Sequence, residues 1–124
     1  MQKLKFEASW DKAISEQDRE QILNVFKETH PNGHDVEFTP LWQAVNHKGE
    51  LLVTVLVQNY SGNDVDFHNK KLRYTVNQEM VAAHTFTIPA LVVEGETSMP
   101  WTFIFPVESL KNSDFEGGTL HFVE

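Results

Sequence analysis

One stretch of sequence decides the fold of this chain: Leu51-Leu52-Val53-Thr54-Val55-Leu56-Val57. It is apolar at odd and even positions alike and rich in β-branched residues, which favour extended backbone. A polar segment with a glycine precedes it at 47–50, and the cluster Asn59-Tyr60-Ser61-Gly62-Asn63-Asp64 follows it. Because turn sequences bound a run that must be covered on both faces, the pattern predicts a central strand of a sheet.

Shorter runs of alternating apolar and polar residues recur on either side of this central strand. The further predicted strands cover residues 41–45, 65–67, 72–76, 81–88, 101–105 and 119–123. Residues 89–100 are predicted to be irregular, and Pro106 is expected to end a strand because proline cannot donate a ladder hydrogen bond. Short strands at this spacing predict a mainly β fold, an immunoglobulin-like antiparallel β-sandwich over about 36–123.

Ahead of the strands, residues from about 15 to 28 have the pattern of one amphipathic helix. Ser15 is followed three residues later by Asp18, a pairing that is typical of a helix N-terminus. Apolar residues recur at helical spacing between 22 and 26, and Pro31 follows where the helix should end. The sequence therefore predicts a single N-terminal helix in front of the sandwich.

Size and charge limit the classes of function. The chain has 124 residues, 40% of them hydrophobic, which suits one domain spanning 1–124. Its 10 Lys and Arg against 18 Asp and Glu give a formal net charge of −8. Nucleic acids and anionic lipid surfaces are bound by clustered basic residues, so we expect neither as a partner. The apolar runs are far shorter than the roughly 20 residues that span a membrane, so no membrane span is predicted.

The absence of cysteine excludes disulfides, thiolate nucleophiles and cysteine-based metal sites. Lysines near the N-terminus resemble the start of an export signal, but Glu7 and Asp11 interrupt any apolar run after them. We therefore expect a cytoplasmic protein.

No residue pattern points to catalysis. The serines lie in no G-x-S-x-G context, and Gly117-Gly118 lacks the partner residues of a phosphate-binding loop. The carboxylates form no recognisable acid–base motif. We expect neither an enzymatic activity nor a cofactor.

One local constellation could bind a metal ion. Asp64, Asp66 and His68 alternate, so in a strand all three would project from one face. Two carboxylates and an imidazole are plausible ligands for a divalent cation. The alternative is the polar face of a half-exposed strand, where acidic side chains also discourage aggregation.

Aromatic residues are spread over nearly every predicted strand, as the core of a sandwich requires. Trp10 and Trp42 lie outside the densest strand patterns. They are the candidate interaction residues.

Three segments of the chain resemble a known family, the SLAP domain of Firmicutes. They are Trp10…Ile14-Ser15, then Leu51 to Asn59, and finally Met99-Pro100-Trp101-Thr102-Phe103-Ile104-Phe105-Pro106. The resemblance preserves order and spacing over roughly residues 10 to 123, and its most specific part is P-W-T-F-x-F-P. The chain departs from the family pattern at Gln58, where an arginine is expected before the asparagine.

The resemblance implies a non-catalytic adaptor that assists export or assembly of surface-layer proteins through the accessory Sec route. The partner would be another protein, such as an accessory Sec component or a surface-layer protein. Independently of the resemblance, we expect the chain to be a monomer or a homodimer. A metal- or small-ligand-binding sandwich domain without catalytic activity is the alternative.

Overall fold

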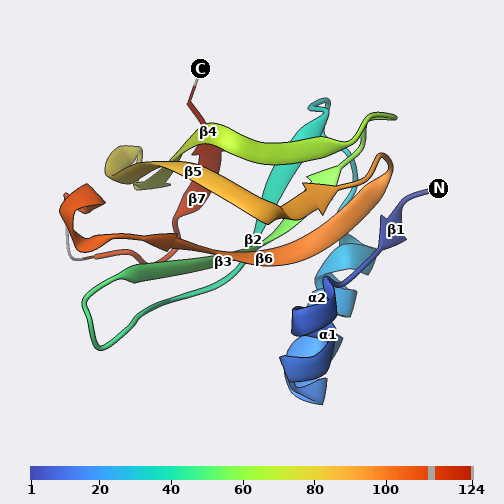
Figure 1. Cartoon of the computed structure of the whole chain (residues 1–124), viewed down its shortest axis with the longest axis horizontal. Coiled ribbons are helices and arrows are strands. Elements are labelled where there is room, and N and C mark those ends of the chain that lie inside the picture. The colour runs from blue at the N-terminus through green and yellow to red at the C-terminus, as the bar shows by residue number, and fades with distance from the viewer. Residues whose placement is uncertain (112–113, 124) are drawn as a thin grey trace.

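Two β-sheets lie face to face, and two short helices lie beside one of them (Figure 1). The computed structural model describes residues 1–111 and 114–123. Its elements are β1 (Lys3–Leu4), α1 (Ala8–Ala13), α2 (Glu16–Glu28), β2 (Val36–Val45), β3 (Leu51–Asn59), β4 (Val65–Val76), β5 (Glu79–Val93), β6 (Thr97–Phe105), the 3₁₀ turn η1 (Val107–Ser109) and β7 (Thr119–Phe122). The prediction of a mainly β sandwich is confirmed.

The four-stranded sheet has the order β1-β6-β3-β2, which places β3 in the interior. β3 pairs antiparallel with β2 on one side and with β6 on the other. Val53, Val55 and Val57 point into the space between the sheets and are almost completely buried. Leu56 points to the opposite face and is also fully buried, although it lies outside that core cluster. The predicted central strand is therefore confirmed, with both of its faces covered.

The three-stranded sheet has the order β5-β4-β7, and both of its pairings are antiparallel. The expectation of an irregular stretch over 89–100 was wrong, because β5 runs to Val93 and β6 begins at Thr97. Pro89 lies on the edge strand β5, where a missing N–H can face away from the ladder. The Ser98 carbonyl faces β1. Pro100 lies two residues further along β6, so its nitrogen, which carries no hydrogen, points to the same side of the strand. β1 pairs only with Thr97 and Ser98, so no ladder hydrogen bond is lost at Pro100.

The N-terminal region differs from the prediction in two ways. α2 begins after Ser15, whose Oγ accepts the Asp18 backbone N–H at 3.1 Å, as predicted. A second helix, α1, precedes it and was not predicted. β1 joins β6 in parallel through Lys3 and Leu4, so the sandwich begins before residue 36 and is not wholly antiparallel. Both additions are too short to produce a clear periodic signal in the sequence.

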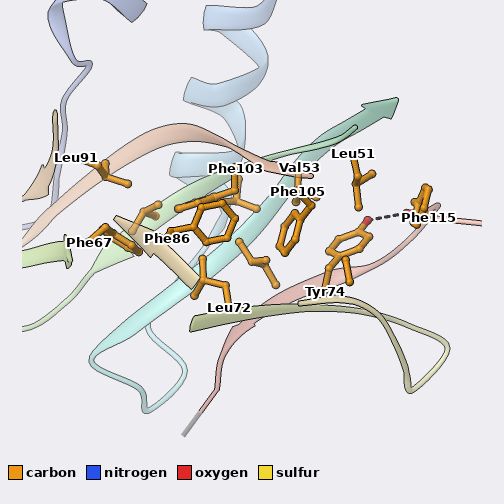
Figure 2. Close-up of a cluster of buried hydrophobic side chains, with 14 of the residues drawn as sticks. Leu51, Val53, Phe67, Leu72, Tyr74, Phe86, Leu91, Phe103, Phe105 and Phe115 are labelled. Atoms are coloured by element: carbon orange, nitrogen blue, oxygen red, sulfur yellow. Dashed lines mark hydrogen bonds between the residues drawn. The ribbon is translucent and has the colours of Figure 1, made fainter. Parts of the chain in front are cut away.

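Aromatic rings fill the space between the sheets (Figure 2). Phe67 of β4 lies 5.5 Å from Phe103 of β6, and Phe86 of β5 lies 5.3 Å from the same ring, measured between centroids. These tilted and edge-on contacts are favoured arrangements of aromatic pairs. The Tyr74 hydroxyl donates a 2.6 Å hydrogen bond to the Phe115 carbonyl, the dashed line in Figure 2. The fully buried rings of the core are thus closed to solvent, and the buried Tyr74 hydroxyl has an acceptor.

The helices cover part of the outer face of the four-stranded sheet (Figure 1). Ile22 of α2 is completely buried, although it lies outside the core between the sheets. The side chain of Gln58, at the end of β3, donates to Thr29 Oγ1 at the C-terminus of α2 at 2.9 Å. Helix and sheet are thus joined by an apolar contact and by a buried amide.

Among the described residues, no helix has the length and apolar character needed to cross a membrane.

Candidate interaction surface

A β-bulge turns Trp42 toward the helices. Phe38 on β2 packs against the core, and Pro40 is paired with Val55, which also faces the core. The register shifts between Pro40 and Trp42, so Trp42 is paired with Thr54 instead. Since Val53 and Val55 face the core, Thr54 lies on the outer face, and directly paired residues share a face. Without the extra residue, Trp42 would have pointed into the core.

Trp10 is brought to the same side by α1. Glu7 caps this helix, accepting the Ser9 backbone N–H at 2.8 Å. Hydrogen bonds from Ser9, first from its hydroxyl and then from its backbone, hold the pKa of Glu7 below its ordinary value. The Trp10 ring leans on Trp101 of β6, with 6.4 Å between the ring centroids.

Trp10 and Trp42 line one groove between α1, the start of α2 and β2. Its volume is about 440 Å³. The lining residues are Ser9, Trp10, Ala13, Ile14, Asp18 and Trp42. Both tryptophans are half-buried, in contrast to the fully buried rings of the core. The two candidate interaction residues therefore belong to a single, largely apolar groove.

Asp18 is the one carboxylate among the residues that line the groove. It is half-buried, and within residues 1–111 and 114–123 its side chain takes part in no hydrogen bond or ion pair. Its neighbour Arg19 is engaged elsewhere: it contacts Asp11 Oδ1 at 2.9 Å and stacks over the Phe6 ring at 4.7 Å. The groove is therefore apolar with a single negative charge.

The whole sequence also agrees with a known family. A comparison with protein families matches the SLAP domain over residues 4–122. The chain belongs to the SLAP domain family. The family prediction made from the Trp10, Leu51 and Met99 segments is confirmed. Comparisons with curated proteins and with solved structures found no match.

Residues 99–106, the most specific part of the family resemblance, contribute side chains to the core of this SLAP domain. Phe103 and Phe105 are completely buried between the sheets, and Trp101 packs against the same core while its ring meets Trp10. The motif thereby links the core to one wall of the groove.

Gln58, at the position where the resemblance to the family predicts an arginine, joins three elements of this SLAP domain through its side-chain amide. Its amide nitrogen donates to Thr29 Oγ1 and, at 2.7 Å, to Thr39 Oγ1. Its carbonyl oxygen accepts the Ser98 hydroxyl at 3.1 Å. Because one neutral amide satisfies hydroxyls from a helix end and two strands, this position needs no charge here.

The candidate metal ligands are not gathered into a site. Asp64 Oδ1 accepts the Gly95 backbone N–H at 3.1 Å, and Asp66 Oδ1 accepts the His68 backbone N–H at 3.2 Å. In the part of the chain that the structure describes, no group of three or more His, Asp or Glu residues could hold a metal ion. The observed contacts fit carboxylates that fasten turns.

Two other hollows are present among the described residues. One, of about 290 Å³, lies beside the gap between the sheets, includes Tyr74 and Gly118, and shares Trp42 with the groove. The second, of about 360 Å³, is lined by Met1, Gln2, Phe26, Thr29, His30, Pro31, Gln58, Tyr60 and Glu96. Burial, and then the nearby Glu37, raise the pKa of Tyr60 above its ordinary value.

Sequence reasoning named the two tryptophans but missed Ile14 and Asp18 as parts of the same surface. Asp18 was assigned only to the helix cap. The available signal was the short spacing from Trp10 to Ile14, one helical turn, which places both side chains on one face of α1 and its C-cap. The bulge after Pro40 left no comparable signal.

Proposed function

We propose that this chain is a non-catalytic interaction domain that assists export or assembly of surface-layer proteins through the accessory Sec route. The groove between Trp10 and Trp42 is the proposed contact surface. Membership of the SLAP domain family supports the assignment, and the lack of a nucleophile, acid–base or phosphate-binding motif in the sequence favours a non-catalytic role.

One observation carries the proposal: two tryptophans from distant parts of the chain wall a single apolar groove. Most of the other large aromatic side chains pack in or against the core between the sheets. Tryptophan is enriched among the few residues that supply most of the binding energy in protein interfaces, especially where it sits in a partly preformed pocket. A folded chain gains little by leaving two such rings partly exposed, whereas a partner would bury them fully.

Affinity capture with the tagged chain tests the proposal. The lysate comes from a Gram-positive bacterium with a surface layer, and bound proteins are identified by mass spectrometry. We expect accessory Sec components or a surface-layer precursor with the unaltered chain, and loss of them with Trp42→Ala. Met80→Ala is the matched control, because Met80 is an exposed apolar residue on β5 of the other sheet. Equal capture by the unaltered chain and Trp42→Ala would contradict the proposed surface.

A further inference from the structure

We infer that the groove between Trp10 and Trp42 accepts a lysine or arginine side chain from an extended basic segment of the partner protein. This inference rests on the proposed function and adds the chemistry of the bound segment. Three observations support it: the residues that line the groove, the charge of Asp18, and the contacts that already engage the neighbouring Arg19.

The aromatic walls suit a cationic side chain with an apolar stem. Lys and Arg bury their methylene stems against apolar surface and place their charge over aromatic faces. Trp10 and Trp42 both line the groove of about 440 Å³, together with Ala13 and Ile14.

The carboxylate of Asp18 supplies the charge complementarity. It lies on the lining of the same groove, half-buried, and makes no hydrogen bond or ion pair in the described part of the chain. A carboxylate that is partly removed from water and lacks a partner favours an incoming cation over an apolar or acidic group.

A cation beside an aromatic ring and a carboxylate is already present next to the groove. The Arg19 guanidinium lies over the Phe6 ring at 4.7 Å and pairs with Asp11 at 2.9 Å. The cation next to Asp18 in the sequence is therefore held by another carboxylate and another ring. The groove repeats the ring and the carboxylate but lacks the cation.

The charge of the whole chain acts in the same direction. A formal net charge of −8 attracts a basic segment at long range and repels an acidic one. This attraction raises the association rate, whereas Asp18 and the tryptophans fix where the cation rests.

Selection of random dodecapeptides displayed on phage, with the full chain immobilised, tests the inference. We expect the enriched peptides to share a lysine or arginine at one aligned position. Fluorescence anisotropy with a synthetic enriched peptide then measures affinity. Replacing the shared basic residue by norleucine should weaken binding about tenfold, since a cation between aromatic walls loses both attractions.

A double-mutant cycle links that cation to Asp18. Asp18→Asn should weaken the basic peptide several-fold and leave the norleucine peptide almost unchanged. Glu16→Gln is the matched control: it removes one negative charge from the same helical turn, yet Glu16 does not line the groove. Circular dichroism confirms that both variants are folded.

Three results would overturn the inference: no peptide is enriched, the enriched peptides lack a shared basic residue, or Asp18→Asn and Glu16→Gln weaken binding equally. These results are distinct from failure of the proposed function. If Trp42→Ala still abolishes capture of the cellular partner, the groove is a contact surface and only the chemistry of the segment is wrong. If Trp42→Ala leaves capture unchanged, the proposed function fails as well.

Discussion

The core and the groove of this SLAP domain are both built from aromatic side chains. They differ in how much of each ring is exposed to solvent and in whether the polar groups beside the rings have hydrogen-bond partners. In the core, Phe67 and Phe103 are at most 1% exposed, and the Tyr74 hydroxyl has its acceptor. In the groove, Trp10 and Trp42 are half-buried beside a carboxylate without a partner in the described chain. The comparison shows that aromatic content alone does not separate the two regions. They differ in how far the rings are covered and in the presence of a carboxylate that has no hydrogen-bond or ion-pair partner in the described part of the chain.

Phe103→Ala should have the largest effect on stability. The ring contacts aromatic rings from the opposite sheet, and its removal leaves a cavity at the centre of the core. We expect the free energy of unfolding to fall by about 3–5 kcal/mol. Urea denaturation followed by circular dichroism measures the change, and Phe103→Leu should cost less because it keeps more volume. A loss below about 1 kcal/mol would show that the core is not closed as described.

Gly118→Ala should cost about 1–3 kcal/mol of unfolding free energy, because overpacking forces neighbouring groups to move. A Cβ atom at this position would overlap the Tyr74 ring. Gly62→Ala is the matched control, since nothing lies within 4 Å of its added Cβ. Thermal unfolding midpoints of the two variants should differ clearly, and equal midpoints would contradict the close approach of Gly118 to the Tyr74 ring.

Gln58→Leu should cost about 1–3 kcal/mol of unfolding free energy, because the buried Ser98 hydroxyl loses its acceptor and two half-buried threonine hydroxyls lose a donor. Thr29, Thr39 and Ser98 would each lose a hydrogen bond. Hydrogen–deuterium exchange of the backbone amides should become faster in α2, while the amides of the strands in both sheets stay protected. Equally faster exchange in α2 and in the strands would contradict a role of Gln58 that is confined to the contact between α2 and the sheet.

Sequence reasoning reached the core more easily than the groove. Residues 51–57 are apolar on both faces, and that pattern specifies a central strand whatever the rest of the chain does. Pro89 misled the prediction because its tolerance depends on an edge position, which is a property of the assembled sheet. The meeting of Trp10 with Trp42 depends on a bulge and on the docking of α1, so the sequence could nominate each tryptophan but not their common groove.

The smallest expected effect concerns pH. Partial burial, and then the nearby Arg73, lower the pKa of His121 on β7. In the unfolded chain the pKa of histidine is about 6.5, so the unfolded state takes up a proton first as pH falls. The contribution of His121 is therefore present above about pH 6.5 and is lost as the pH drops toward the lower native pKa.

Urea midpoints at about pH 7.5 and about pH 5.5 measure this dependence. His121→Gln should reduce the difference between the two midpoints. An unchanged difference would assign the pH dependence to other groups.

The most direct test of the contrast between core and groove is to measure Trp42→Ala twice, once for stability and once for partner capture. Part of the Trp42 side chain stays exposed, so the free energy of unfolding should fall by less than it does for Phe103→Ala. Capture of the partner should be lost under conditions where the variant is fully folded. Retained capture, or a loss of stability as large as that of Phe103→Ala, would show that Trp42 belongs to the core and not to a contact surface.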